Sequence, residues 1–284
     1  LYHSPNFIMP HFDGAQVITI HDLPTIRFPQ FHRKQMVVLC EGGIRSAIEG
    51  KVQVITDSFH VRDELVKDFG VEGSRISTVH LAPDPRCRPR HESECRHALD
   101  ALGLSYKAFF LSVGTIEPRK NLLRVFEAFR AGRRASHFDW PLIVVGASGW
   151  KSSREHEMLD ELIKDGLALY LDYVTDDTLL TLYASAGALV FPSLYEGFGL
   201  PALEAAACGC PVITSEHSAM AEFAPEQTLF VNPEDVSSIS DALKAIPSRS
   251  EFGSGFDVST QAAARTWVDV AQETSDVYRA ALQG

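Results

Sequence analysis

Two carboxylates, Glu196 and Glu204, lie in a segment whose pattern predicts a strand, a glycine-rich loop and a helix. The loop, Ser193–Gly199, runs into Pro201, which suits a first helical turn because that turn leaves its N–H groups unpaired. Unpaired N–H groups and the helix dipole favour an anion such as phosphate. Carboxylates beside a phosphate are costly unless they bind hydroxyl groups, so the combination favours a sugar nucleotide. The alternative is an ordinary turn with two surface acids, since short glycine motifs often mislead.

Other polar side chains follow two further predicted strands. His21 and Asp22 come directly after the apolar run Val17–Ile20, where a histidine can hydrogen-bond a hydroxyl or a phosphate. A turn histidine, with Asp22 as a helix cap, is an equally good interpretation. Arg119 and Lys120 stand at the predicted start of a helix. Because cations oppose the dipole at a helix N-terminus, a bound anion explains this pair better than solvent does.

The elements that must position these residues alternate between strands and helices, which predicts an α/β protein with parallel sheets. Three strands precede a stiff stretch, Pro83–Pro89, that we interpret as an interdomain linker, and six follow it. The pattern Phe31–Ile48 has helical character that Gly42 and Gly43 weaken. The predicted strands are Val17–Ile20, Val52–Thr56, Ile76–Val79, Phe109–Val113, Leu142–Val145, Leu167–Leu171, Ala188–Phe191, Cys210–Thr214 and Leu229–Val231.

Composition excludes several classes of protein. The net charge of -11 argues against a nucleic-acid-binding protein, which needs a basic surface. No apolar run approaches the roughly 20 residues that span a bilayer, and no signal peptide is visible. The five cysteines match no zinc-binding spacing and fit a reducing cytosol. The first residues, LYHSPNFIMP, lack an initiating Met, so we expect the sequence to start within a longer chain.

Two segments together resemble a known family. PSLYEGFGLPALEAAACGCPVITS (192–215) resembles the acid–seven–acid signature of retaining glycosyltransferases with the GT-B fold, family 4, and VGTIEPRKNLLRVFEAF (113–129) is similar to a second segment of that family. The resemblance implies two Rossmann-like domains that face a cleft, the first one truncated. It places a partial acceptor-side domain at 1–88, a nucleotide-sugar-binding domain at 89–262, and a helix at 263–284 that packs back on the first domain.

The resemblance also implies roles for individual residues. A lysine at the Lys120 position contacts the donor diphosphate in this family, and an arginine often stands where this chain has Thr115, a place that Arg119 would take over. Glu196 would bind the donor sugar and His21 would help to hold it, which makes His21, Arg119, Lys120 and Glu196 the candidate catalytic residues. The candidate nucleotide-binding residues are Gly114, Thr115, Tyr173, Val174, Gly197, Phe198, Gly199, Leu200 and Glu204. For Tyr173 and Val174, core packing is an equally good interpretation.

The resemblance implies transfer of a hexose to an acceptor hydroxyl with retention of configuration, without a metal or other cofactor. Its likeness to mannosyltransferases favours GDP-mannose as donor; UDP-glucose, UDP-N-acetylglucosamine and galactose-type donors stay open. The expected acceptor is a glycan or a lipid-linked glycan, handled in the cytoplasm or at the inner face of the membrane, where peripheral association is open. Two alternatives remain: a non-catalytic sugar-nucleotide-binding or scaffold subunit, and a GT-B epimerase. A pyridoxal-dependent phosphorylase is excluded by the small size, and the oligomeric state is open.

Overall fold

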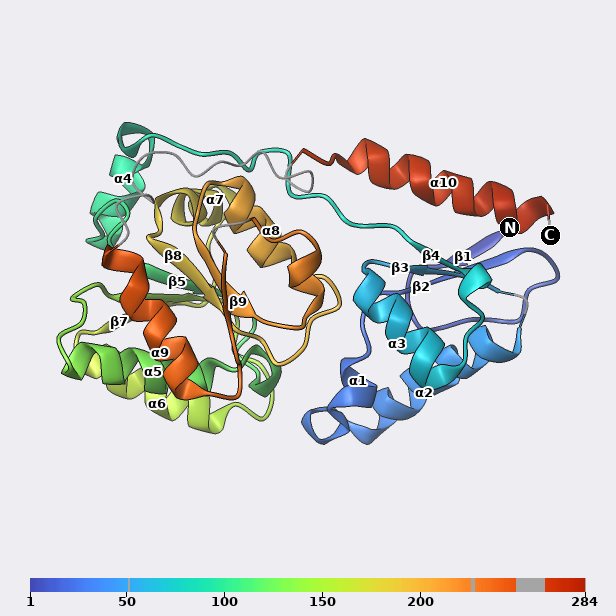
Figure 1. Cartoon of the computed structure of the whole chain (residues 1–284), viewed down its shortest axis with the longest axis horizontal. Coiled ribbons are helices and arrows are strands. Elements are labelled where there is room, and N and C mark those ends of the chain that lie inside the picture. The colour runs from blue at the N-terminus through green and yellow to red at the C-terminus, as the bar shows by residue number, and fades with distance from the viewer. Residues whose placement is uncertain (51, 226–227, 249–263, 284) are drawn as a thin grey trace. The chain divides into compact units, whose positions relative to one another are not determined.

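The computed structural model describes residues 1–50, 52–225, 228–248 and 264–283, and the chain divides into two compact units (Figure 1). Unit 1 consists of Leu1–Ala82, Tyr195–Gly199 and Arg265–Gly284, and unit 2 of Pro83–Leu194 and Leu200–Ala264. Each unit is built on a parallel sheet, which confirms the predicted α/β class. No helix among the residues described is both long and apolar enough to cross a bilayer.

Unit 1 has a sheet of four parallel strands, ordered along the sheet as they are along the chain: β1 (Tyr2–Ser4), β2 (Gln16–Ile20), β3 (Gln53–Thr56) and β4 (Ile76–Thr78). Its helices are α1 (Pro24–Arg27), α2 (Lys34–Glu49), α3 (Phe59–Phe69) and α10 (Trp267–Gln283). Alternate residues of a strand face opposite sides. Ile18 therefore packs with the residues of α2 and α3, and Val17 packs with Val270 and Val277 of α10 on the other face (Figure 1). Residues 263 and 284, at the ends of the helix predicted over 263–284, lie outside the described residues.

Two local features of unit 1 differ from the prediction. The strand β1 is short and polar, so it carries no apolar signal, and only its pairing with β2 reveals it. Helix α2 continues through Gly42 and Gly43 instead of weakening there. A Cβ atom on Gly43 would overlap the carbonyl oxygen of Phe7, so this glycine permits a close backbone approach. Ser58 caps α3, because its hydroxyl accepts the N–H of Val61 at 3.2 Å.

Unit 2 has a sheet of six parallel strands in the order β10-β9-β8-β5-β6-β7. The strands are β5 (Phe110–Val113), β6 (Leu142–Val145), β7 (Ala168–Leu171), β8 (Ala188–Phe191), β9 (Val212–Ser215) and β10 (Leu229–Val231), close to the six predicted ones. In this order the chain builds outward from β5 to β7 and then returns to start the other half at β8. The neighbours β5 and β8 thus form the switch point at which ligands bind in doubly wound sheets.

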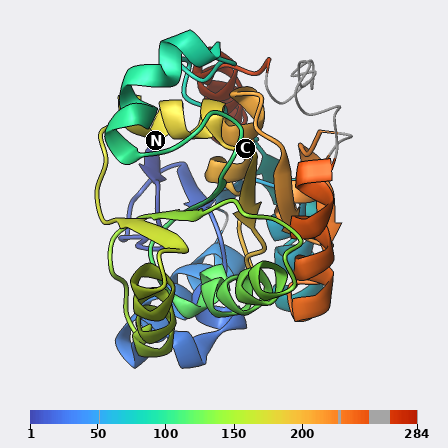
Figure 2. The same cartoon turned by 90° about the vertical axis from the view of Figure 1, so that its left-hand side faces the viewer.

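The helices of unit 2 cover both faces of this sheet: α4 (Glu92–Leu102), α5 (Leu122–Arg134), α6 (Ser153–Lys164), α7 (Asp176–Ser185), α8 (Leu200–Ala207) and α9 (Val236–Ala245). Figure 2 shows α5 between α6 and α9, and their apolar residues share one core with strands β5, β6 and β8. On the opposite side α7 lies against α4 and α8 (Figure 1). Thr175 caps α7 as an N-cap threonine does, with its hydroxyl accepting the N–H of Thr178 at 3.3 Å.

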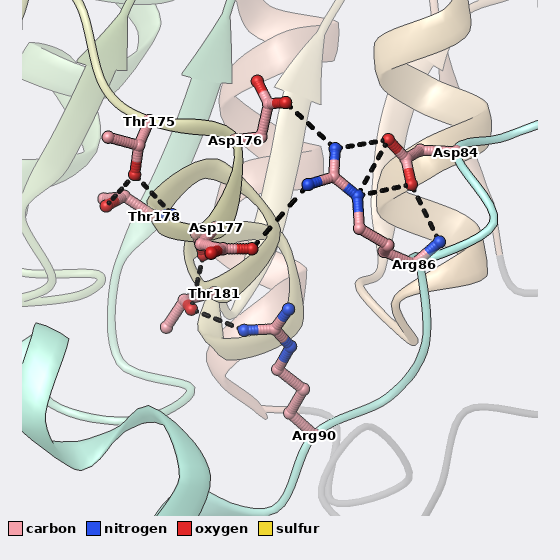
Figure 3. Close-up of polar contacts among 8 residues, drawn as sticks. All are labelled: Asp84, Arg86, Arg90, Thr175, Asp176, Asp177, Thr178 and Thr181. Atoms are coloured by element: carbon pink, nitrogen blue, oxygen red, sulfur yellow. Dashed lines mark hydrogen bonds and ion pairs between the residues drawn. The ribbon is translucent and has the colours of Figure 1, made fainter.

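Two segments, the proline-rich stretch and the loop Tyr195–Gly199, fall in other units than the predicted domains 1–88 and 89–262 placed them. The proline-rich stretch belongs to unit 2, because Arg86 forms ion pairs with Asp84 at 2.7 Å and with Asp176 of α7 at 2.9 Å (Figure 3). Arg90 adds a hydrogen bond to Thr181 at 2.7 Å. The stretch is therefore held against α7. The loop Tyr195–Gly199, which the prediction gave to the second domain, belongs to unit 1.

Candidate functional site

The switch point of unit 2 carries a lysine. Gly114 follows β5, and Lys120 lies beside it: a Cβ atom on Gly114 would be 3.4 Å from Cε of Lys120. The Lys120 ammonium also lies 5.0 Å from the ring centroid of Phe191, the last residue of β8. The side chain thus stands where two adjacent strands end, and ligands of doubly wound sheets bind there. Gly114 and Lys120, two of the candidate residues, are therefore neighbours in the structure.

The backbone before α5 fixes the position of this lysine. Lys120 ends a short 3₁₀ helix, Pro118–Lys120, and Asn121 then adopts a left-handed conformation with φ of 61°. The Asn121 amide donates to the carbonyl oxygens of Pro192 at 2.9 Å and Pro233 at 2.7 Å. Helix α5 begins only at Leu122. The two cations therefore precede the helix instead of occupying its first turn, and the dipole argument for them weakens.

Arg119 has an anionic partner within its own turn. Its Nε and Nη2 atoms donate to Oε1 of Glu117 at 3.1 and 2.7 Å, and the Glu117 side chain is buried. A buried carboxylate needs such a pairing because burial disfavours an isolated charge. Arg119 therefore neutralises Glu117, a role that was not predicted from the sequence.

Glu204 lies on α8 among acidic groups. Burial, and then the charges of Asp84 and Asp176, raise the pKa of Glu204 to about 7. The buried hydroxyl of Tyr183 opposes this shift and lowers the pKa of Glu204. Arg86 neutralises Asp84 and Asp176 rather than Glu204 (Figure 3). The carboxyl group is therefore poised to change its charge near neutral pH.

The other predicted residues of unit 2 lie on loops or at helix starts. Thr115 lies in the loop after β5, which pairs with the glycine loop after β6 through Ile116 and Ser148. Tyr173 is 84% exposed at the end of β7, so core packing is the wrong interpretation for it, and Val174 is half-buried. Leu200 opens α8.

The loop Tyr195–Gly199, here called the acidic loop, is held in unit 1 by hydrogen bonds. The hydroxyl of Tyr195 donates to Oε2 of Glu64 at 2.6 Å and accepts the N–H of Leu23 at 3.1 Å. Two residues later, the hydroxyl of Ser58 donates to the carbonyl oxygen of Gly197 at 2.6 Å. Glu196 lies between these two anchors and is 7% exposed. Its backbone position is therefore fixed on both sides by groups of unit 1.

The same loop meets the end of β2. A Cβ atom on Gly197 would overlap the carbonyl oxygen of His21, so only glycine fits at this approach. Phe198 is buried, with its ring centroid 6.0 Å from that of His80. Gly199 has φ of 101°, a conformation that favours glycine, and it ends the part of the loop assigned to unit 1.

His21 has a partner that the sequence analysis missed. Its Nδ1 atom lies 2.7 Å from Oδ2 of Asp57, and its Nε2 atom lies 3.0 Å from the carbonyl oxygen of Pro5. Strands β2 and β3 pair Ile20 with Thr56, so the residues that follow each strand lie side by side. The hydrogen bond to Asp57 raises the pKa of His21 above its usual value, against the effect of burial. The sequence did carry a signal for this contact, because His21 and Asp57 each directly follow one of two adjacent strands.

The predicted residues thus fall into two groups, one in each unit. Unit 1 brings together His21, Glu196, Gly197, Phe198 and Gly199. Unit 2 holds Gly114, Thr115, Arg119, Lys120, Tyr173, Val174, Leu200 and Glu204. Among the residues that the structure describes, no group of three or more His, Cys, Asp or Glu side chains could hold a metal ion.

A family model described as glycosyl transferases group 1 matches residues 101–253. The chain belongs to this family. Two relatives of this chain are named O-antigen chain mannosyltransferases. The chain is 35% identical over 240 residues to O-antigen chain mannosyltransferase B of Escherichia coli, covering 84% of this chain and 63% of the relative. It is 28% identical over 232 residues to RfbU of Salmonella typhimurium, covering 81% and 60%. The chain therefore spans about three fifths of the length of these relatives.

Solved structures identify the fold of this chain as GT-B. A sucrose-phosphate synthase from Thermosynechococcus elongatus matches with a TM-score of 0.74 at 21% identity, covering 94% of this chain and 68% of the other. HepE from Anabaena, solved with UDP and glucose, matches with a TM-score of 0.68 at 16% identity, covering 94% and 71%. At such identities the likeness establishes the fold, and the ligands in those structures are properties of those proteins.

Proposed function

We propose that this chain belongs to a retaining hexosyltransferase that moves mannose from GDP-mannose to a hydroxyl group of a growing polysaccharide. The observation that carries the proposal is Lys120 at the switch point of unit 2, where a doubly wound sheet binds its ligand. The names of the mannosyltransferase relatives favour mannose. The acceptor is proposed to be a glycan or lipid-linked glycan, handled at the cytoplasmic face of a membrane.

Each charged group has a proposed role in this reaction. Lys120, with the N–H groups that open α8, would stabilise the charge that develops on the departing diphosphate. Glu204 would accept hydrogen bonds from the ribose hydroxyls, and Glu196, buried and anchored by its neighbours, would orient the donor sugar. Arg119 would contribute mainly through Glu117, which it binds.

The reaction that fits these groups proceeds on one face of the sugar. We place no covalent nucleophile among the candidate residues, so the leaving phosphate would take the proton of the acceptor hydroxyl. No metal is assigned a role, because a lysine and the N–H groups opening a helix can bind a diphosphate. Chelation tests that point, since activity that survives EDTA would support it and activity restored by Mg²⁺ would contradict it.

A thermal-shift panel of nucleotide sugars on the whole chain tests the proposal. A ligand that binds only the native state raises the melting temperature, by RT ln(1 + [L]/Kd) in free energy of unfolding. GDP-mannose should raise it more than UDP-glucose, UDP-N-acetylglucosamine or UDP-galactose at equal concentration. A larger rise with a UDP-sugar would identify that sugar nucleotide as the donor instead. A melting temperature that no nucleotide sugar raised would contradict the proposal. Release of free mannose without acceptor would identify an epimerase-like hydrolysis instead.

A further inference from the structure

Both ring nitrogens of His21 face oxygen acceptors. Nδ1 lies 2.7 Å from a carboxylate oxygen of Asp57, and Nε2 lies 3.0 Å from the carbonyl oxygen of Pro5. A neutral imidazole carries a single N–H and can satisfy only one acceptor, whereas an imidazolium donates from both nitrogens. A backbone carbonyl has no proton to offer in return. The geometry therefore selects the charged form of the ring.

Asp57 is built to hold this charge. The side chain of Asp57 is 6% exposed, and that of His21 is 49% exposed. A carboxylate buried to this degree needs a cationic or hydrogen-bonding partner, because water cannot reach it. The pairing of Ile20 with Thr56 across β2 and β3 fixes the two residues side by side. The imidazole ring of His21 is therefore partly accessible to solvent, whereas the carboxylate of Asp57 is buried.

We propose that Asp57 is a positioning residue that, with the Pro5 carbonyl, keeps His21 doubly protonated. When the ligand binds, one of its oxygen atoms accepts the hydrogen bond of the Nε2–H in place of the Pro5 carbonyl. This inference rests on the proposed function for the identity of the ligand, a nucleotide sugar. The oxygen must be an acceptor, so it belongs to a phosphate or to a sugar hydroxyl that accepts. His21 then serves as a fixed donor and cation, and it does not act as a base.

The other charged groups around the ring are consistent with this assignment. Asp57 and Asp22 both raise the pKa of His21, and burial opposes them. His3, on β1, has a lowered pKa because it is buried and because His21 is charged. Glu196 lies in the loop that packs against the His21 backbone. The carboxylates of Asp57 and Asp22 therefore both favour a cation at His21.

Nuclear magnetic resonance of the histidine rings in the whole chain decides the first half of the proposal. The His21 signals are assigned by their loss in His21→Gln, and their ¹⁵N shifts are followed from pH 5 to pH 9. We expect both nitrogens to be protonated at pH 7 in the wild type. In Asp57→Asn the midpoint of the His21 titration should fall by about one pH unit or more. Asp13→Asn is the matched control, since the Asp13 side chain is 95% exposed and its carboxylate lies 3.8 Å from His11.

A wild-type His21 that is neutral at pH 7 would overturn the inference, even if Asp57→Asn did not fold. An unchanged midpoint in a folded Asp57→Asn protein would overturn it too. For the ligand half, calorimetry with GDP-mannose should show affinity reduced about tenfold in Asp57→Asn, the effect of one lost charge-assisted hydrogen bond, and unchanged in Asp13→Asn. If the wild type bound no nucleotide sugar, the proposed function and the ligand role would fall, while the ring titration would still judge the role of Asp57.

Discussion

The backbone at Gly197 touches the backbone at His21: a Cβ atom on Gly197 would overlap the carbonyl oxygen of His21 and lie 2.6 Å from Cβ of Asp22. This approach sets the acidic loop directly on the end of β2, in the same unit as His21 and Asp57. The hydrogen bonds of Tyr195 and Ser58 hold the loop on both sides of Glu196. The position of Glu196 therefore depends on a glycine that cannot be enlarged.

The first prediction concerns that glycine. Gly197→Ala should destabilise the protein by about 1–3 kcal/mol, because overpacking against backbone atoms forces the loop to move. Gly42→Ala is the matched control: nothing lies within 4 Å of its Cβ, and alanine in a helix should stabilise by about 0.5–1 kcal/mol. Urea unfolding measures both. Equal stabilities for the two variants would show that the loop does not need the close approach.

The second prediction concerns the anchor of the same loop. Tyr195→Phe should destabilise by about 1–2 kcal/mol, because the buried N–H of Leu23 loses its acceptor. Hydrogen exchange of residues 193–199 should speed up. Tyr173→Phe, at a site 84% exposed, should change stability by less than about 0.5 kcal/mol. Unchanged exchange in Tyr195→Phe would mean that the hydroxyl does not hold the loop.

The third prediction uses the raised pKa of Glu204. Between its ordinary 4.5 and about 7 the folded state binds more protons than the unfolded chain, so stability should fall as pH rises through this window. The loss should be about 2 kcal/mol, discounted from the full shift for the partial exposure of the group. Glu204→Gln should remove this fall. Urea unfolding at pH 5 and pH 8 measures it, with Glu157→Gln, at an exposed position of α6, as the control. The same pH slope in Glu204→Gln and wild type would reject the prediction.

The fourth prediction separates diphosphate from nucleoside. Lys120→Ala should weaken GDP binding about tenfold to a hundredfold and leave guanosine binding unchanged, because the ammonium is assigned to the diphosphate. Lys164→Ala, in the last turn of α6, should affect neither. Calorimetry measures these affinities. Equal losses for GDP and guanosine would assign Lys120 to the structure of the loop and not to the diphosphate.

Much of this architecture could be predicted because its causes are local. The apolar runs of β5 to β10 mark a doubly wound sheet, and Ser58 and Thr175 are N-caps by residue type alone. The two acids of the 192–215 segment were likewise visible from their spacing. What failed depends on contacts between distant residues. The loop at Tyr195 belongs to unit 1 because its hydroxyl reaches Glu64, and Asp57 meets His21 only through strand register.

One other difference from the prediction has a similar reason. The pair Gly42 and Gly43 weakens a helix in isolation, yet α2 continues because the helix packs on the sheet and Gly43 lets Phe7 approach. The proline-rich stretch begins where the two units divide, and Arg86 also ties it to Asp176 of unit 2. Tertiary contacts therefore decided each point on which local preference was wrong.

We propose that the diphosphate of the donor is bound by Lys120 and its sugar by Glu196. The most direct test is calorimetric titration of GDP and GDP-mannose into the wild type, Lys120→Ala and Glu196→Gln. We expect Lys120→Ala to bind both ligands more weakly, and Glu196→Gln to bind GDP-mannose more weakly while its affinity for GDP stays unchanged. The proposal would be contradicted if Glu196→Gln bound both ligands with wild-type affinity, or if Lys120→Ala kept wild-type affinity for both.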